Sequence, residues 1–168
     1  AAAESVTFGQ ETLRRVGLLL YPRVAYGVLN GGSATSYADV TKNQSFSPEL
    51  LDLLREPFDR LAQVSRDRAK GLTPAYMNPD GSLGYSFIQL KMRNLLLQAA
   101  LSRAEYERMD TDPESLGLPD PLLPFFQMTS IYTDGELAEA YQAYRSTAPL
   151  AELIDTMDYS WQYWVSDN

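Results

Sequence analysis

Three short apolar runs, separated by segments with helical spacing, place the strongest constraint on how this chain can fold. The runs are Val24–Leu29, Pro124–Met128 and Trp161–Val165. Their length and apolar character are typical of strands buried in a parallel sheet. The order strand, helix, strand, helix, strand is the usual order of a parallel α/β sheet. We therefore predict an α/β fold in which these three runs lie side by side and helices flank them.

Two of the intervening helices are predicted between the first and second runs. The clearer one covers Ser86–Tyr106, where apolar residues at positions 88, 92, 95, 96 and 99 define one buried face. The other begins at Ser47, which is a suitable N-cap followed by a proline in the first turn. This helix is expected to extend toward Lys70 and to break or kink near Pro57.

A third helix is predicted after the second run, over Thr133–Ser146. Thr133 is the expected N-cap, and Glu136 three residues later completes the pattern of a capping box. In that motif the two side chains bond to each other's backbone N–H groups. The prediction therefore assigns both side chains a local role at the start of the helix.

Composition excludes several classes of chemistry. The chain has 168 residues, a length suited to one domain, and contains neither histidine nor cysteine. Catalysis by Ser-His or Cys-His pairs and metal binding by His or Cys are therefore excluded. The net charge of −8 argues against nucleic acid as a partner. No apolar run could span a bilayer and no signal-peptide pattern begins the chain, so we expect a cytoplasmic location and no membrane partner.

A loop of small residues, Asn30–Ser36, directly follows the first apolar run. Glycines allow several backbone N–H groups to approach one phosphate group, and this end of a parallel strand is the usual ligand edge. Lys42, a few residues further on, could supply a positive charge. The alternative is an ordinary turn, since the spacing matches neither the G-x-G-x-x-G nor the G-x-x-x-x-G-K-[ST] pattern.

The chain contains four motif-like stretches in order, at 29–36, 70–84, 86–93 and 124–130. Together they resemble the UDP-sugar pyrophosphorylase superfamily. Leu29–Ser36 (LNGGSATS) resembles the LNGGLGTS signature of UTP–glucose-1-phosphate uridylyltransferases and the LAGGxGTRLG loop of UDP-N-acetylhexosamine pyrophosphorylases. Lys70–Ala75 and Asp80–Gly84 lead into Ser86–Arg93 (SFIQLKMR), which is similar to that superfamily's sFLELKMR helix. Pro124–Ser130 (PFFQMTS) with a following threonine resembles its PxxLMTS…T strand and turn.

The resemblance implies both a fold and a reaction. It implies that residues 1–168 are the N-terminal, nucleotide-binding portion of a Rossmann-like nucleotidyltransferase sheet, which would be incomplete in this chain. The implied activity transfers UMP from UTP to a sugar 1-phosphate and releases pyrophosphate. Mg²⁺ is the implied cofactor, with its ligands outside this chain. We expect the 168 residues alone to be inactive.

The resemblance also assigns roles to residues. Lys42 is the implied catalytic cation that contacts phosphate. The implied nucleotide-binding residues are Gly31, Gly32, Ala34, Thr35, Thr129 and Ser130, the first four through their backbone. No metal ligand is assigned. All three lysines of the chain, Lys42, Lys70 and Lys91, fall within or beside the four stretches, although Lys91 also suits a solvated helix position.

A second function remains open from the sequence. Ala34 stands where the family has a glycine, and Ala38 stands near another missing glycine. These departures favour a non-catalytic α/β binding or interaction module that kept the loop but lost the chemistry. The retained Lys42 favours the enzyme.

Overall fold

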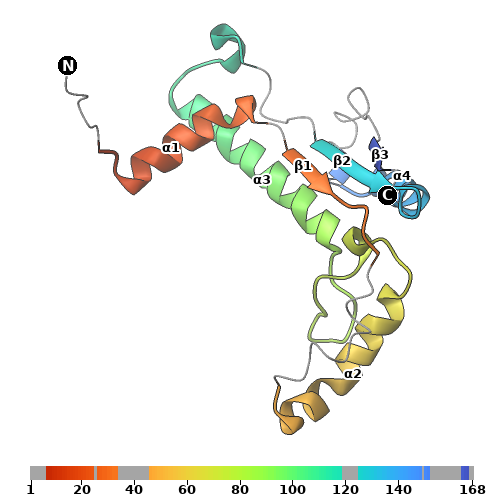
Figure 1. Ribbon diagram of the computed structural model, residues 1–168. Helices are drawn as coiled ribbons and strands as arrows, with labels where there is room; N and C mark the ends of the chain where they lie inside the picture. Colours follow the sequence, from red (N-terminus) through yellow and green to blue (C-terminus); the bar gives the residue numbers. More distant parts are fainter. Residues whose placement is uncertain are drawn as a thin grey trace, which may run out of the picture.

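A parallel three-stranded sheet forms the centre of the chain, as the apolar runs predict. The computed structural model describes residues 7–24, 26–33, 46–118, 125–148, 150–151 and 164–166. The strands are β1 (Tyr26–Leu29), β2 (Phe125–Ser130) and β3 (Trp164–Ser166), in the order β1-β2-β3 (Figure 1). Both pairings are parallel, and Leu29 at the end of β1 lies opposite Met128 of β2. The predicted α/β class is thus confirmed.

The helix α3 (Phe87–Arg108) supplies more residues to the core beneath the sheet than any other described element. Its N-terminus is held by a capping box, in which the N–H of Gln89 donates to Ser86 Oγ (3.3 Å) and the N–H of Ser86 donates to Gln89 Oε1 (2.9 Å). Four of the five apolar positions predicted for its buried face are buried: Ile88, Met92, Leu95 and Ala99. The apolar periodicity therefore identified the correct face.

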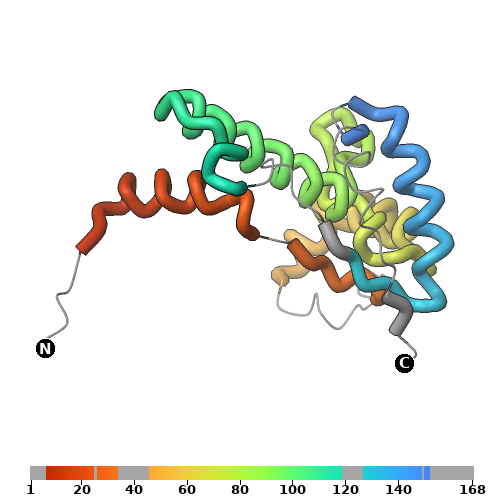
Figure 2. The backbone as a smooth tube through the Cα atoms, turned by 90° about the horizontal axis from the view of Figure 1, so that it is seen from above, coloured from red at the N-terminus to blue at the C-terminus, as the bar shows by residue number. Residues whose placement is uncertain are grey.

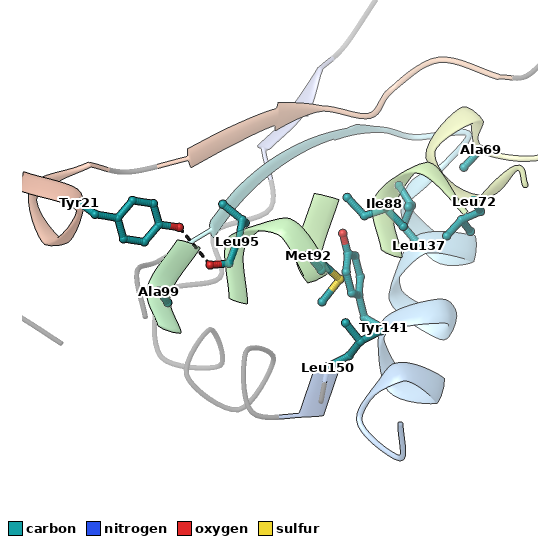
Figure 3. Packing of buried hydrophobic residues seen from close by; sticks show 10 residues of the cluster. All are labelled: Tyr21, Ala69, Leu72, Ile88, Met92, Leu95, Ala99, Leu137, Tyr141 and Leu150. Atoms are coloured by element: carbon teal, nitrogen blue, oxygen red, sulfur yellow. Dashed lines mark hydrogen bonds between the residues drawn. The ribbon is translucent and has the colours of Figure 1, made fainter. Parts of the chain in front are cut away.

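The helix α4 (Asp134–Tyr144) packs against the same core. Its Leu137 and Tyr141 lie beside Met92 and Ile88 of α3 (Figure 3). The hydroxyl group of Tyr141 donates to Gln127 of β2, which ties α4 to the covered face of the sheet. Helices α3 and α4 thus cover one and the same face.

The opposite face of the sheet is exposed within the described part of the chain. Leu29 of β1 is 81% exposed and its neighbour Met128 of β2 is 44% exposed. Parallel sheets are usually covered on both faces. The described residues therefore build one side of an α/β sandwich.

Two further helices leave the centre. α1 (Gln10–Leu20) extends away from the sheet and meets the distant end of α3, where Ser102 Oγ donates to the carbonyl group of Leu18 at 2.7 Å (Figures 1 and 2). α2 (Pro48–Ser65) is exposed or half-buried along its length apart from Ser65. Among the described residues, no helix combines the length and the apolar character needed to cross a membrane.

The sequence led us to expect that α2 breaks or kinks near Pro57 and extends toward Lys70. No break occurs, since α2 continues through Pro57 as one helix; a helical proline removes one backbone hydrogen bond while its neighbours keep theirs. The helix ends at Ser65 rather than near Lys70, since Arg66 is extended and Asp67 has a positive φ of 58°.

The predicted capping box of α4 is also absent. Thr133 is the N-cap residue, but its side chain makes no capping bond to the helix. Its Oγ1 instead accepts from the N–H of Ser130 (3.1 Å) and donates to the carbonyl group of Asn30 (3.1 Å). Glu136 bonds to a distant segment, as described below. Thr133 and Glu136 thus bond to residues outside the helix, and the predicted capping box does not form.

Candidate functional site

A cavity of about 590 Å³ lies where the end of β1 meets the first turns of α3. The third wall is a short 3-10 turn, η4 (Lys70–Leu72). The described residues that line the cavity are Val28, Leu29, Asn30, Gly32, Lys70, Gly71, Phe87, Ile88, Leu90 and Lys91. The site thus lies at the carboxyl edge of a parallel sheet, where ligands bind in open α/β folds.

Two lysines from separate elements meet at this cavity. Lys70 belongs to η4, whereas Lys91 lies in α3 one turn after Phe87. Both side chains are exposed at the cavity. The described lining contains no carboxylate to neutralise them, although the chain as a whole carries a charge of −8. This local positive charge favours an anionic ligand.

The rest of the lining is mainly apolar. Phe87 and Leu90 of α3 are partly exposed and line the cavity together with Val28 and Leu29 at the end of β1. Binding sites for small molecules commonly combine such apolar walls with a few charged or polar groups. The cavity therefore suits a ligand that has both an anionic group and an apolar surface.

The loop that follows β1 is held by hydrogen bonds to β2 on one side and to η4 on the other. The N–H of Asn30 donates to the carbonyl group of Met128 in β2 (2.7 Å), and Ser130 Oγ donates to the carbonyl group of Gly31 (2.9 Å). The carbonyl group of Gly32 accepts from the N–H of Lys70 (2.8 Å). Among the described residues, the N–H groups of Gly31 and Gly32 have no hydrogen-bond partner. The carbonyl groups of the loop are therefore bonded to other parts of the protein. The N–H groups of Gly31 and Gly32 are unpaired within the described part of the chain.

The two glycines have different surroundings. A Cβ at Gly31 would lie 3.4 Å from Ser130 Cβ, so this residue packs closely against the end of β2. A Cβ at Gly32 would meet nothing within 4 Å, and Gly32 lines the cavity. Of the two predicted loop residues that the structure describes, Gly32 lines the cavity and Gly31 packs beside it against the end of β2.

The other predicted site residues divide into two groups. Ala34, Thr35 and Lys42 lie outside the described residues. Thr129 is buried and its Oγ1 donates to Asp134 Oδ1 (2.8 Å), while Ser130 holds the loop. Neither side chain is among those lining the cavity. Thr129 and Ser130 therefore lie near the site through their position at the end of β2.

Lys70 was not among the residues assigned to binding from the sequence. It stands at the expected end of the helix that begins at Ser47, and its approach to β1 depends on contacts across about forty positions of sequence. Two features of the sequence could have identified Lys70 as a site residue. The chain contains only three lysines, and Lys70–Gly71 begins one of the stretches that resemble the superfamily. Lys91, which suited a solvated helix position, also lies at the cavity.

Ionisation near the site is affected by burial. Tyr144 of α4 lies beside the N-cap of α3, where its hydroxyl group is 3.2 Å from Ser86 Oγ. Burial raises the pKa of Tyr144 above its ordinary value. The shift moves ionisation of this phenol further above physiological pH, and the neutral hydroxyl group serves as a hydrogen-bonding group.

The described part of the chain does not fit a metal centre. It contains no group of three or more His, Cys, Asp or Glu residues that could hold a metal ion. The described cavity lining offers Lys70, Lys91 and the amide group of Asn30 as its side-chain polar groups. Cationic lysines repel Mg²⁺, which prefers carboxylate and phosphate oxygens.

Comparisons with family models, with curated proteins and with solved structures gave no match.

Proposed function

We propose that this chain is the nucleotide-binding portion of a UTP–sugar-1-phosphate uridylyltransferase, with a Rossmann-like sheet and a cytoplasmic location. The observation that carries the proposal is the cavity at the carboxyl edge of the sheet, where Lys70 and Lys91 meet the loop after β1. A triphosphate needs several donors and cations at such an edge. The sequence resemblance supplies the identity of the nucleotide and of the second substrate.

The proposed reaction is an in-line displacement at phosphorus. A phosphate oxygen of the sugar 1-phosphate attacks the α-phosphorus of UTP and forms the new P–O bond. The bond from the α-phosphorus to the oxygen bridging it to the β-phosphate breaks, and pyrophosphate leaves with that electron pair. Such reactions depend on alignment and on stabilisation of developing negative charge, and they need no protein nucleophile. The absence of histidine is compatible with this chemistry.

Each wall of the cavity has a proposed role. Lys70 and Lys91 bind phosphate oxygens, and the N–H groups of Gly31 and Gly32 contribute donors from the loop. Phe87 and Leu90 offer an apolar surface to the non-phosphate part of a ligand. Lys42 is retained as a further phosphate contact from the segment that follows the loop. Magnesium is assigned no ligand among the described residues, so no step is derived through it.

Charge reversal at Lys70 tests the binding half of the proposal. Losing a hydrogen bond to a charged group costs about 1–3 kcal/mol, so Lys70→Glu should weaken UTP binding by roughly 5- to 150-fold in isothermal calorimetry. Arg55→Glu is the matched control, because Arg55 is exposed on α2 and does not line the cavity. Arg68 would be a poor control, since its Nε lies 2.9 Å from Glu136 Oε1 next to η4. Equal effects of the two reversals, or no UTP binding by the unmodified chain, would refute nucleotide binding at this cavity.

Catalysis is tested separately from binding. Pyrophosphate release should be measured with UTP, glucose 1-phosphate and Mg²⁺, using the complete natural protein that contains these residues. Turnover that falls in Lys70→Glu and persists in Arg55→Glu is the expected result. UTP binding without any pyrophosphate release would favour the non-catalytic binding module.

A further inference from the structure

Asn30 lines the cavity at the point where the end of β1 meets β2 and η4. It is the first residue after β1, and its side chain is almost fully buried, with 4% of the residue exposed. Its Oδ1 accepts from the N–H of Gly71 in η4 at 3.0 Å. Its Nδ2 lies 3.5 Å from Gln127 Oε1 on β2, which also accepts from the hydroxyl group of Tyr141. The Asn30 amide therefore connects η4 to the covered face of the sheet.

Gly71 permits this contact because it has no side chain. A Cβ at position 71 would lie 2.3 Å from Asn30 Nδ2 and 2.4 Å from Asn30 Oδ1. These separations are far below van der Waals contact, so any larger residue would displace the Asn30 amide. The two residues are fitted to each other across 41 positions of sequence.

Three consecutive backbone N–H groups hold this segment in place. The N–H of Ala69 donates to Glu136 Oε2 of α4 (2.7 Å), and the N–H of Lys70 donates to the carbonyl group of Gly32 (2.8 Å). The N–H of Gly71 donates to Asn30. One donor thus reaches α4 and the other two reach the loop that follows β1, and Lys70 is the middle residue of the three. Its backbone is fixed on both sides, and the long side chain is free to extend into the cavity.

We propose that Asn30 is a positioning residue, which acts by fixing the backbone that presents Lys70 to the anionic ligand. The identity of the ligand rests on the proposed function. The contact between Asn30 and Gly71 is independent of it. Asn30 contributes through Lys70 rather than through its own bond to UTP. Removing its amide releases one of the three donors and widens the range of positions available to the Lys70 ammonium group.

A double-mutant cycle separates positioning from general damage to the fold. UTP is titrated calorimetrically into the unmodified chain, Asn30→Ala, Lys70→Ala and the double variant. Asn30→Ala should weaken UTP binding by roughly tenfold in the presence of Lys70, and by less than about twofold once Lys70 is absent. Ser102→Ala is the matched control, because it removes a buried hydrogen bond far from the cavity. It should lower the unfolding temperature while leaving the Kd for UTP unchanged.

A second arm needs no ligand. Gly71→Ala should lower the unfolding temperature in the unmodified chain, because its methyl group collides with the Asn30 amide. In the Asn30→Ala background the same methyl group occupies the vacated space, and the added loss should largely disappear. Hydrogen exchange of the segment 70–72 should also accelerate in Asn30→Ala and stay unchanged in Ser102→Ala.

The outcomes distinguish the two proposals. Failure of the unmodified chain to bind UTP refutes the proposed function, and the ligand-free arm then decides whether Asn30 fixes the Lys70 segment. If Asn30→Ala weakens UTP binding equally with and without Lys70, positioning through Lys70 is refuted. If Gly71→Ala is as damaging in the Asn30→Ala background as in the unmodified chain, or exchange at 70–72 is unchanged in Asn30→Ala, the fixed contact is refuted.

Discussion

Truncation of Leu137 tests whether α4 is an essential cover of the sheet. Leu137 has 0% exposure and packs in the core with Ile88 and Met92 of α3 (Figure 3). Leu137→Ala removes three carbon atoms, each worth about 0.8 kcal/mol of transfer free energy. The cavity left behind adds a further cost, because a core held between a sheet and two helices collapses only partly. We expect the free energy of unfolding to fall by about 3 kcal/mol, within the range of roughly 2–5 kcal/mol for buried leucines.

The assay is urea unfolding followed by far-ultraviolet circular dichroism, with the slope of the transition compared between variants. The matched control is Leu53→Ala on α2. It makes the same chemical change at a leucine that is 75% exposed. Its effect should stay within about 0.5 kcal/mol, since surface substitutions rarely cost more. An unchanged slope would show that stability alone has changed. A cost below about 1 kcal/mol for Leu137→Ala, or equal costs at the two positions, would refute the assignment of α4 to the core.

Two further predictions concern α3 and the tyrosine that packs against it. Ser86→Ala should lower the free energy of unfolding by about 1 kcal/mol, because the capping box then loses its acceptor for the N–H of Gln89; no loss in a urea titration would show that the cap is not stabilising. Burial, aided by the neighbouring Tyr26, raises the pKa of Tyr21 above its ordinary value near 10. The unfolded chain therefore releases this proton first, so the contribution is complete below about pH 10 and is lost as pH rises above it. Tyr21→Phe should show a shallower alkaline loss of stability than the unmodified chain, and identical slopes would contradict the assignment.

Local signals in the sequence determined the elements of this fold. Each of the three apolar runs contributes residues to one of the neighbouring parallel strands, and the helical spacing from Ser86 onward identifies the buried face of α3. Ser47 caps α2 as predicted, with its side chain accepting from the N–H of Leu50. These features depend on strand burial, helical periodicity and bonds between residues three positions apart. Such interactions can be read from a short window of sequence.

Tertiary structure decided which polar side chains act together. Thr133 and Glu136 have the spacing of a capping box, but Thr133 bonds to Asn30 and Glu136 bonds to Arg68 and Ala69. A side chain with several possible partners takes the set that leaves the fewest buried groups unsatisfied, and that set depends on the packed fold.

The residues of the candidate site were likewise brought together by the tertiary structure. Asn30, Lys70 and Lys91 lie far apart in the sequence and carry no shared periodicity, yet they line one cavity. Their meeting depends on β1 pairing with β2, on α3 packing beneath the sheet, and on a glycine at position 71 that admits the Asn30 amide. Close approach of this kind is a property of distant backbone segments once they are packed, which is why no short stretch of the sequence specifies it.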